Sequence, residues 1–243
     1  MLTLRGRTCV IAGGSGQVGH GAVKELVRSG MNVVMLTHMT ADAEALAKEL
    51  AGEKGRCTYI AGRKETEVFA DIYTEYGSVD VLIINTGEFL KKRNLEEYPK
   101  EEFDRSMNRQ WHILEMINAA LPYLRRSSAG RIILTTSASA CMGFNHESLM
   151  DAMSRGAERS LVLYLAKELA GERITVNAIE KSGMLNDHEP KEDGYDAESI
   201  IPYIPLGRNG ESSEFAAAAA YLASEEAGFV TGQILHVSGG LAS

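Results

Sequence analysis

The clearest indication of the fold stands at residues 9–26, CVIAGGSGQVGHGAVKEL. An apolar run at its start predicts a strand, and apolar residues three and four apart at its end predict a helix. Between them, Gly13, Gly16 and Gly19 recur at intervals of three. Such glycines allow a tight turn, let backbone amides approach a pyrophosphate, and let the helix pack closely against the strand. The turn therefore predicts a nucleotide-binding site, to which we assign Gly13, Ser15, Gly16, Gln17, Val18 and Gly19.

The alternation of strand and helix continues through the rest of the chain. Six more short apolar runs follow, and helical patterns lie between most of them. The runs stand at residues 32–37, 57–62, 79–87, 130–139, 173–180 and 234–240. This alternation predicts the α/β class, as a Rossmann-type, doubly wound parallel sheet with helices on both faces. No linker or change of composition divides the sequence, so we predict a single domain over residues 1–243.

The segment at about residues 184–210 is the loosest part of the sequence. It carries many charges and three of the five prolines. A connection of this length inside a compact domain is usually a lid or a binding loop, and parallel sheets bind ligands beyond the carboxyl ends of their strands. We therefore predict a substrate lid here. The alternative is a solvated excursion of the chain.

Composition argues against several classes of protein. A formal net charge of −8, with no long cluster of lysine and arginine, argues against a nucleic-acid partner. No apolar run approaches the roughly 18 residues that a membrane span needs. Three cysteines cannot all pair, which favours a reducing cytoplasm, and Cys9 and Cys57 stand in apolar runs where a thiol usually packs. The six histidines show no zinc-ligand spacing, so we predict no metal site.

The end of the second predicted strand bears on the choice of cofactor. An acidic residue there would bind the adenosine ribose and exclude a 2′-phosphate. Thr37 and His38 occupy this position instead. The missing acid removes the main feature that selects NAD, but no arginine or lysine stands there to bind a phosphate. The sequence therefore favours NADP(H) over NAD(H) only slightly.

Several stretches together resemble one known family. They are INTG at 84–87, GRIILTTSASA at 130–140, ITVNAI at 174–179 and IPLGRNGESSEFAAAAAYLASEEAGFVTGQILHVSGG at 204–240. With the glycine-rich turn, they resemble the short-chain dehydrogenase/reductase family over essentially the whole chain. The glycine spacing is similar to that of the family's extended and atypical members, because Gln17 stands at the usual second glycine.

This resemblance implies an oxidoreductase that uses NAD(P)(H). It places the family's catalytic serine at Ser137 and assigns Asn85, Thr86 and Gly87 to the cofactor site. Related proteins also pair the helices of this region between subunits.

The resemblance breaks down at the residues that carry the family's chemistry. The family's Tyr-x-x-x-Lys motif lies 12 to 14 residues after the serine. A count without gaps from LAKELA, residues 165–170, places it on Asp151 and Arg155. Another register would use Met150 and Ser154, which offer neither an acid nor a cation.

Other family positions have changed as well. The helical asparagine of the family falls on Gln110, and the Pro-Gly pair after the sixth strand is Lys181-Ser182. The threonine that would contact the nicotinamide amide is Asn186. Of the family's usual catalytic set, Ser137 alone is unchanged.

Asp151 and Arg155 stand four residues apart and so share one helix face. They are either a surface ion pair or the centre of a remodelled site. A carboxylate beside a guanidinium is ionised at neutral pH and cannot donate a proton, so Asp151 cannot replace the tyrosine as an acid. Arg155 can hold ribose hydroxyls, or bind an anionic substrate group with its planar fork.

A few other residues are candidates for the proton donor. His146 lies in the segment between Ser137 and the next helix, and an imidazole suits acid–base work near neutral pH. The alternative is an exposed loop histidine. Tyr195 and Tyr203 in the predicted lid are further candidates, and we interpret Cys141 as a small packing residue rather than a nucleophile.

The sequence leaves three functions open. The first is an NAD(P)(H)-dependent oxidoreductase acting on a small carbonyl or alcohol substrate. The second is a nucleotide-binding protein without turnover, acting as a sensor or partner subunit, and the third is a lyase or isomerase in which Asp151 is a base. An apolar stripe of Leu161, Leu165 and Leu169 adds the expectation of a homo-oligomer, a tetramer first and a dimer second.

Overall fold

The computed structural model describes residues 2–87, 93–142, 148–184 and 197–242 of the chain. Its strands are β1 (Thr8–Ala12), β2 (Asn32–Leu36), β3 (Cys57–Ile60), β4 (Val81–Ile84), β5 (Gly130–Ser137), β6 (Ile174–Lys181) and β7 (Ile234–Val237). Its α-helices are α1 (Gln17–Arg28), α2 (Thr40–Glu49), α3 (Phe69–Tyr76), α4 (Lys100–Leu124), α5 (Ser139–Met142), α6 (Leu149–Leu169) and α7 (Ser212–Ala223).

The strands form one seven-stranded sheet in the order β3-β2-β1-β4-β5-β6-β7. Every neighbouring pair is parallel. The order reverses between β1 and β4, and a crevice for ligands lies at such a switch point, outside the carboxyl ends of the strands. The predicted Rossmann-type α/β fold is confirmed.

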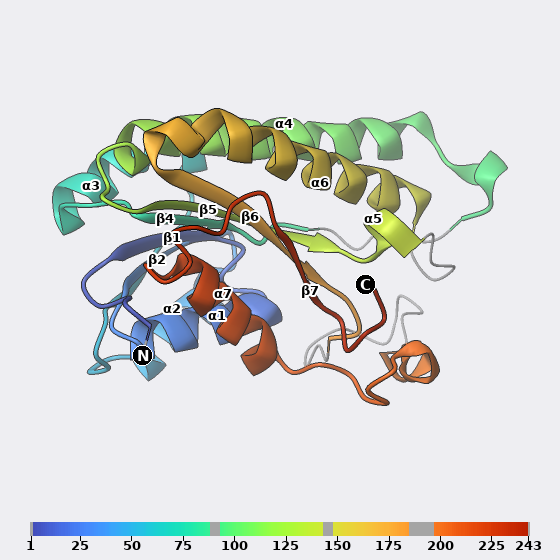
Figure 1. Cartoon of the computed structure of the whole chain (residues 1–243), viewed down its shortest axis with the longest axis horizontal. Coiled ribbons are helices and arrows are strands. Elements are labelled where there is room, and N and C mark those ends of the chain that lie inside the picture. The colour runs from blue at the N-terminus through green and yellow to red at the C-terminus, as the bar shows by residue number, and fades with distance from the viewer. Residues whose placement is uncertain (1, 88–92, 143–147, 185–196, 243) are drawn as a thin grey trace.

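Helices cover both faces of the sheet (Figure 1). α1, α2 and α7 lie on one face, and α3, α4 and α6 lie on the other. In β2, Val33 and Met35 pack into the core on the α1 side, whereas Val34 and Leu36 pack into the core on the opposite side. Because both faces of each strand are buried, the strands are almost continuously apolar rather than alternating.

The leucine stripe of α6 faces inward. Leu169 is buried, and Leu161 and Leu165 are half-buried against the core on the α4 side of the sheet. The prediction that this stripe supplies a subunit interface is therefore wrong, because the stripe is used to attach α6 to its own domain. No helix within the described ranges is both long enough and apolar enough to cross a membrane.

The ends of the predicted lid segment meet at the carboxyl end of β6. Met184 forms an isolated bridge with Gly210, and Ala197–Tyr203 forms a 3-10 helix. Residues 185–196 lie outside the described part of the chain, so the lid itself stays a prediction.

The three cysteines are free. Cys9 is buried in β1, and Cys57 is half-buried in β3, where burial raises the pKa of its thiol to about 11. The prediction that these two residues pack is confirmed. Cys141 is exposed, so its interpretation as a packing residue is wrong.

Candidate functional site

The glycine-rich turn joins β1 to α1 at the switch point of the sheet. Gly13 has φ 78°, and a Cβ there would lie 2.3 Å from the backbone oxygen of Asn85. A Cβ on Gly19 would lie 2.3 Å from the oxygen of Gly13. Neither position can accept a side chain, because each would collide with backbone.

Gly16 differs from its two neighbours in the turn. A Cβ there would meet nothing closer than the Gly13 oxygen at 3.7 Å, so its surroundings are open. Gly16 is the N-cap of α1, whose first turn carries no acidic residue. A helix N-terminus with open space before it suits a pyrophosphate, because its amides and its dipole both favour negative charge. The turn therefore fits a dinucleotide.

The side chains around the turn are less involved than its backbone. Val18 is buried in the core, so its side chain contributes packing, and Gln17 begins α1. The buried Ser15 hydroxyl hydrogen-bonds to the Thr37 hydroxyl, and the Met39 amide donates to the same Thr37 oxygen at 2.9 Å. Thr37 thus ties the end of β2 to the glycine-rich turn.

The predicted cofactor motif after β4 lies next to this turn. Asn85 Nδ2 donates to the Gly13 oxygen at 3.0 Å, which holds the two loops together. Thr86 Oγ1 is buried and has no hydrogen-bond partner within the described part of the chain. A Cβ on Gly87 would lie 2.6 Å from Arg155 Nη2, so this glycine makes room for the Arg155 guanidinium.

Arg155 and Asp151 are largely buried rather than displayed on the surface. Their side chains are only 11% and 12% exposed, and Arg155 Nε lies 3.3 Å from Asp151 Oδ1. Arg155 Nη1 donates to the Thr135 backbone oxygen near the end of β5, at 3.2 Å. The alternative of a surface ion pair is therefore wrong. Arg155 therefore reaches both the loop that follows β4 and the end of β5.

A second pair of charges completes a four-residue network. Glu158, 1% exposed, lies 3.2 Å from Arg155 Nη1. Arg109 Nη2, from α4, lies 3.6 Å from Asp151 Oδ1 and 3.7 Å from Glu158 Oε1. Burial, followed by the nearby Arg155, lowers the pKa of Arg109, and the two carboxylates oppose this shift. We call Arg109, Asp151, Arg155 and Glu158 the charge network; it holds two cations and two anions.

The serines lie at the edge of the charge network. Ser137 is the last residue of β5, and its hydroxyl oxygen accepts a hydrogen bond from the Ser139 amide at 3.3 Å. Ser139 Oγ in turn donates to Asp151 Oδ2 at 3.4 Å. Sequence reasoning missed Ser139, although it stands 12 residues before Asp151 and so within the expected spacing.

The remaining predicted residues have different outcomes. Gln110 Nε2 donates to Glu158 Oε1 at 3.4 Å, so it borders the charge network. His38 is exposed beyond the end of β2. His146 and Asn186 lie outside the described residues. Arg109 and Glu158 were missed, but Asp151, Arg155 and Glu158 repeat at i, i+4 and i+7, which is a signal for one shared helix face.

A second buried charge lies away from this network. Glu180 in β6 is fully buried, pairs with Arg159 of α6, and has His236 Nδ1 at 2.7 Å from Oε1. Cys141 Sγ donates to the same Oε1 at 3.4 Å. Burial and the Glu180 charge raise the pKa of the Cys141 thiol, which makes it a poor nucleophile. Within the described residues, no group of three or more histidine, cysteine or acidic side chains is arranged to hold a metal ion.

The comparisons with known proteins agree with this geometry. A family model described as enoyl-(acyl carrier protein) reductase matches residues 13–242. The chain belongs to this family, the short-chain dehydrogenases/reductases. A curated relative, the 3-oxoacyl-[acyl-carrier-protein] reductase FabG of Staphylococcus epidermidis, is 29% identical over 97% of this chain and 98% of its own length. The enzyme of the same name from Thermotoga maritima is 27% identical over 99% of both chains.

Solved structures of the family superpose on the whole chain. A dehydrogenase/reductase from Sinorhizobium meliloti is 27% identical, covers 99% of this chain and 97% of its own, and has a TM-score of 0.90. A blue fluorescent protein from a metagenomic library, solved in complex with NADPH, is 27% identical and has a TM-score of 0.88. The match covers 99% of this chain and 100% of that protein's chain. The chain is thus an oxidoreductase of the short-chain dehydrogenase/reductase type.

Proposed function

We propose that this oxidoreductase uses NAD(P)(H) and acts on a small carbonyl or alcohol substrate at a site built around Ser137, Asp151 and Arg155. The observation that carries the proposal is the contact between the Arg155 guanidinium and Gly87, because it places the charge network against the predicted cofactor loop. The glycine-rich turn supports the same edge of the sheet as the cofactor site. The NADPH complex of a similar structure and the reductase names of the relatives support the class of reaction.

The residues of the turn would hold the cofactor. The backbone around Gly16 would bind the pyrophosphate, and Thr86 with its unsatisfied hydroxyl would face the nucleotide. Thr37 and His38 offer no carboxylate to a ribose, which favours NADP(H) slightly. When bound, the nicotinamide supplies or accepts a hydride.

Arg155 is the binding group of this proposal. Thr135 and Glu158 fix Nη1, while Nη2 points at Gly87 and so toward the cofactor loop. From there the guanidinium would hold ribose hydroxyls or an anionic group of the substrate. Asp151 orients Arg155 and receives a hydrogen bond from Ser139, so its role is to position these groups.

The proton for the substrate oxygen comes from another group. His146 remains our candidate, and Ser137, at the end of β5, would hydrogen-bond to the substrate oxygen. Asn186 and the predicted lid would close over the nicotinamide.

Calorimetric titration with NADH, NAD⁺, NADPH and NADP⁺, followed by a panel of carbonyls and alcohols, tests the proposal. The panel includes small 3-oxo esters, because the curated relatives are named for 3-oxoacyl substrates. We expect binding and turnover. Binding without turnover would favour a sensor or partner subunit, and proton exchange without net redox would favour a lyase or isomerase. No binding of any dinucleotide would refute the proposed cofactor site.

We also propose a homo-oligomer, a tetramer first and a dimer second. α4 packs beside α6, and their surfaces expose Trp111 of α4 and Leu163 and Tyr164 of α6 by 64%, 52% and 69%. Exposed aromatic residues on adjacent helices favour an interface with a second copy. Light scattering at micromolar concentration tests it, and a monomer would contradict it. The free cysteines favour a cytoplasmic location.

A further inference from the structure

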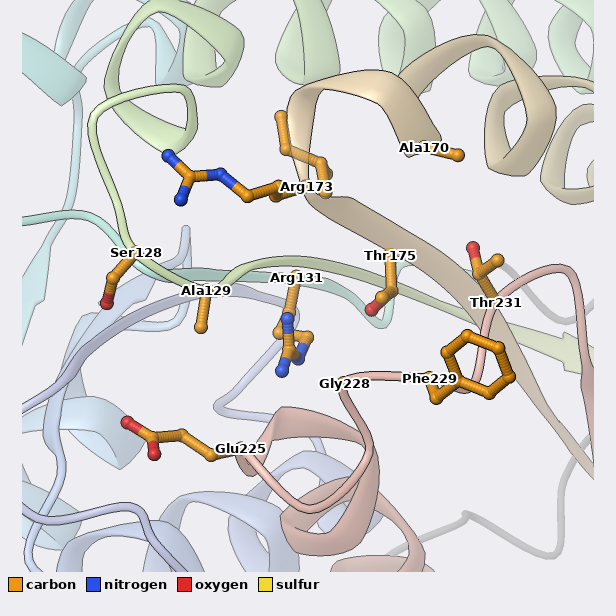
Figure 2. Close-up of a pocket in the computed structure, with 11 residues that line it drawn as sticks. Ser128, Ala129, Arg131, Ala170, Arg173, Thr175, Glu225, Gly228, Phe229 and Thr231 are labelled. Carbon is orange, nitrogen blue, oxygen red and sulfur yellow. The ribbon is translucent and has the colours of Figure 1, made fainter.

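A cavity lies at the edge of the sheet opposite the cofactor site. Its volume is about 680 Å³, which is within the range of small-molecule sites. It is formed where the amino ends of β5 and β6 meet the loop from α7 to β7. Figure 2 shows this region, and the lining residues that carry the argument are Arg131, Arg173, Thr175, Glu225 and Phe229.

Arg131 brings a buried positive charge to this cavity. It is only 3% exposed, and its guanidinium donates to the backbone oxygens of Ser224 and Gly130. Within the described ranges, no carboxylate lies within 4.0 Å of its nitrogens. Burial lowers the pKa of Arg131, and a second buried guanidinium, that of Arg7, lowers it further. The carbonyls at the end of α7 compensate only part of this charge, because a helix end carries about half an elementary charge.

Thr175 stands directly beside Arg131. The two residues are register partners on β5 and β6, so their side chains leave the sheet on the same face as neighbours. Thr175 is 7% exposed, and its hydroxyl oxygen has no hydrogen-bond partner among the described residues. A buried hydroxyl without a partner is unfavourable, so a ligand that bonds to it would remove this penalty.

The mouth of the cavity is apolar and carries a further arginine. Phe229 is fully exposed, so that nothing in the described structure covers its ring, and Ile174 and Ala170 also line the cavity. Arg173 lies at the exposed rim. Arg131 and Arg173 against Glu225 leave the lining with one net positive charge, which suits a ligand with a single negative charge.

From these observations we propose that the cavity binds a small organic monoanion, a carboxylate with a short hydrocarbon body. The carboxylate would meet Arg131 and Thr175, and the hydrocarbon body would lie against Phe229. Arg173 would close over the anion from the rim. This site is separate from the cofactor cleft, so binding of a carboxylate here does not depend on the proposed oxidoreductase chemistry.

The experiment uses octanoate as the probe and two controls. Octanol lacks the negative charge, and acetate lacks the hydrocarbon body. Calorimetry on the full chain should give binding of octanoate that is tighter than that of either control. Thr175→Val keeps the shape and removes the hydroxyl, and should weaken octanoate binding about two- to tenfold. Phe229→Ala and Arg173→Asn should weaken it as well, and asparagine suits the positive φ of 62° at position 173. Thr74→Val, on the surface of α3, is the matched control and should change nothing.

Three outcomes would overturn the proposal. Octanol binding as tightly as octanoate would show that the charge is not recognised. Octanoate affinity unchanged by Thr175→Val and Phe229→Ala would place the ligand elsewhere. Displacement of octanoate by NADPH would place it in the cofactor cleft. Arg131 also donates a hydrogen bond to the backbone oxygen at the end of α7, so Arg131→Met would disturb folding as well as binding. The variants at Thr175, Phe229 and Arg173 therefore test binding separately from folding.

Discussion

Replacing Arg155 with methionine tests whether the charge network is the functional centre. Methionine keeps much of the apolar stem of the side chain and removes its charge. Arg155 now lies 3.3 Å from Asp151 and 3.2 Å from Glu158, and the variant would leave both carboxylates with Arg109 alone, at 3.6 and 3.7 Å. Breaking a fully buried ion pair destabilises a protein by about 3–5 kcal/mol. Because Arg109 still balances one of the two charges, and the Asp151 side chain keeps 12% of its surface exposed, we expect the free energy of unfolding to fall by about 2–3 kcal/mol.

Urea denaturation measures this loss, and calorimetry measures the affinity for NADPH. We expect the affinity to fall by more than about tenfold, which corresponds to roughly 1.4 kcal/mol. Arg28→Ala is the control, because Arg28 forms an exposed ion pair with Glu53, and loss of such a pair changes stability by under about 1 kcal/mol. Suppose that Arg155→Met lowered the free energy of unfolding no more than Arg28→Ala does, and left NADPH binding and turnover unchanged. The charge network would then have no role in function, and our site would be wrong.

Gly16→Asp should abolish dinucleotide binding without unfolding the protein, because a side chain has room there but would place a negative charge at the pyrophosphate position, whereas Gly13→Ala should unfold it; calorimetry and circular dichroism distinguish the two. Asp151→Tyr combined with Arg155→Lys should create or raise carbonyl reductase activity, and a spectrophotometric assay that showed no gain despite retained cofactor binding would contradict the assigned register. The hydrogen bond from Arg208 and the Glu211 amide lower the pKa of Glu214 to about 2, so this group stabilises the fold above its unfolded pKa of about 4.3, and the contribution is lost as pH falls toward 2. Between about pH 4.3 and about pH 2 the melting temperature of Glu214→Gln should therefore change less than that of the parent chain. Equal changes of melting temperature with pH in the two proteins would contradict the prediction.

Periodicity was sufficient to predict the fold because the physical constraint is local. A parallel sheet covered on both faces requires apolar strands, and these runs stand out between the helical patterns. The glycine-rich turn was equally readable, since Gly13 and Gly19 are fixed by backbone contacts that no other residue would allow. The position of Arg155 also followed from the sequence, because helical spacing ties it to Asp151.

Contacts between distant segments could not be read in the same way. Arg109 reaches the charge network from α4, and nothing in its neighbours distinguishes it from a surface arginine. The leucine stripe of α6 shows the same limit, because periodicity identifies an apolar face but does not say whether that face meets the protein's own sheet or another subunit. The tertiary contacts show that Leu161 packs against the protein's own core, whereas Leu163 on the same helix is exposed.

The composition of the charge network supports a functional role more than a structural one. Burying charged groups carries a desolvation penalty, and well-packed apolar residues of similar volume often serve stability equally well or better. The helix that carries Asp151 and Arg155 packs against an apolar core through Val162 and Ala166, so its attachment does not depend on the charges. The network is instead concentrated where Arg155 meets Gly87, at the edge of the sheet that holds the glycine-rich turn. Asp151 and Glu158, which Arg109 also contacts, hold the Arg155 guanidinium in a fixed orientation there. A fixed guanidinium is what recognition of a ribose or a carboxylate requires.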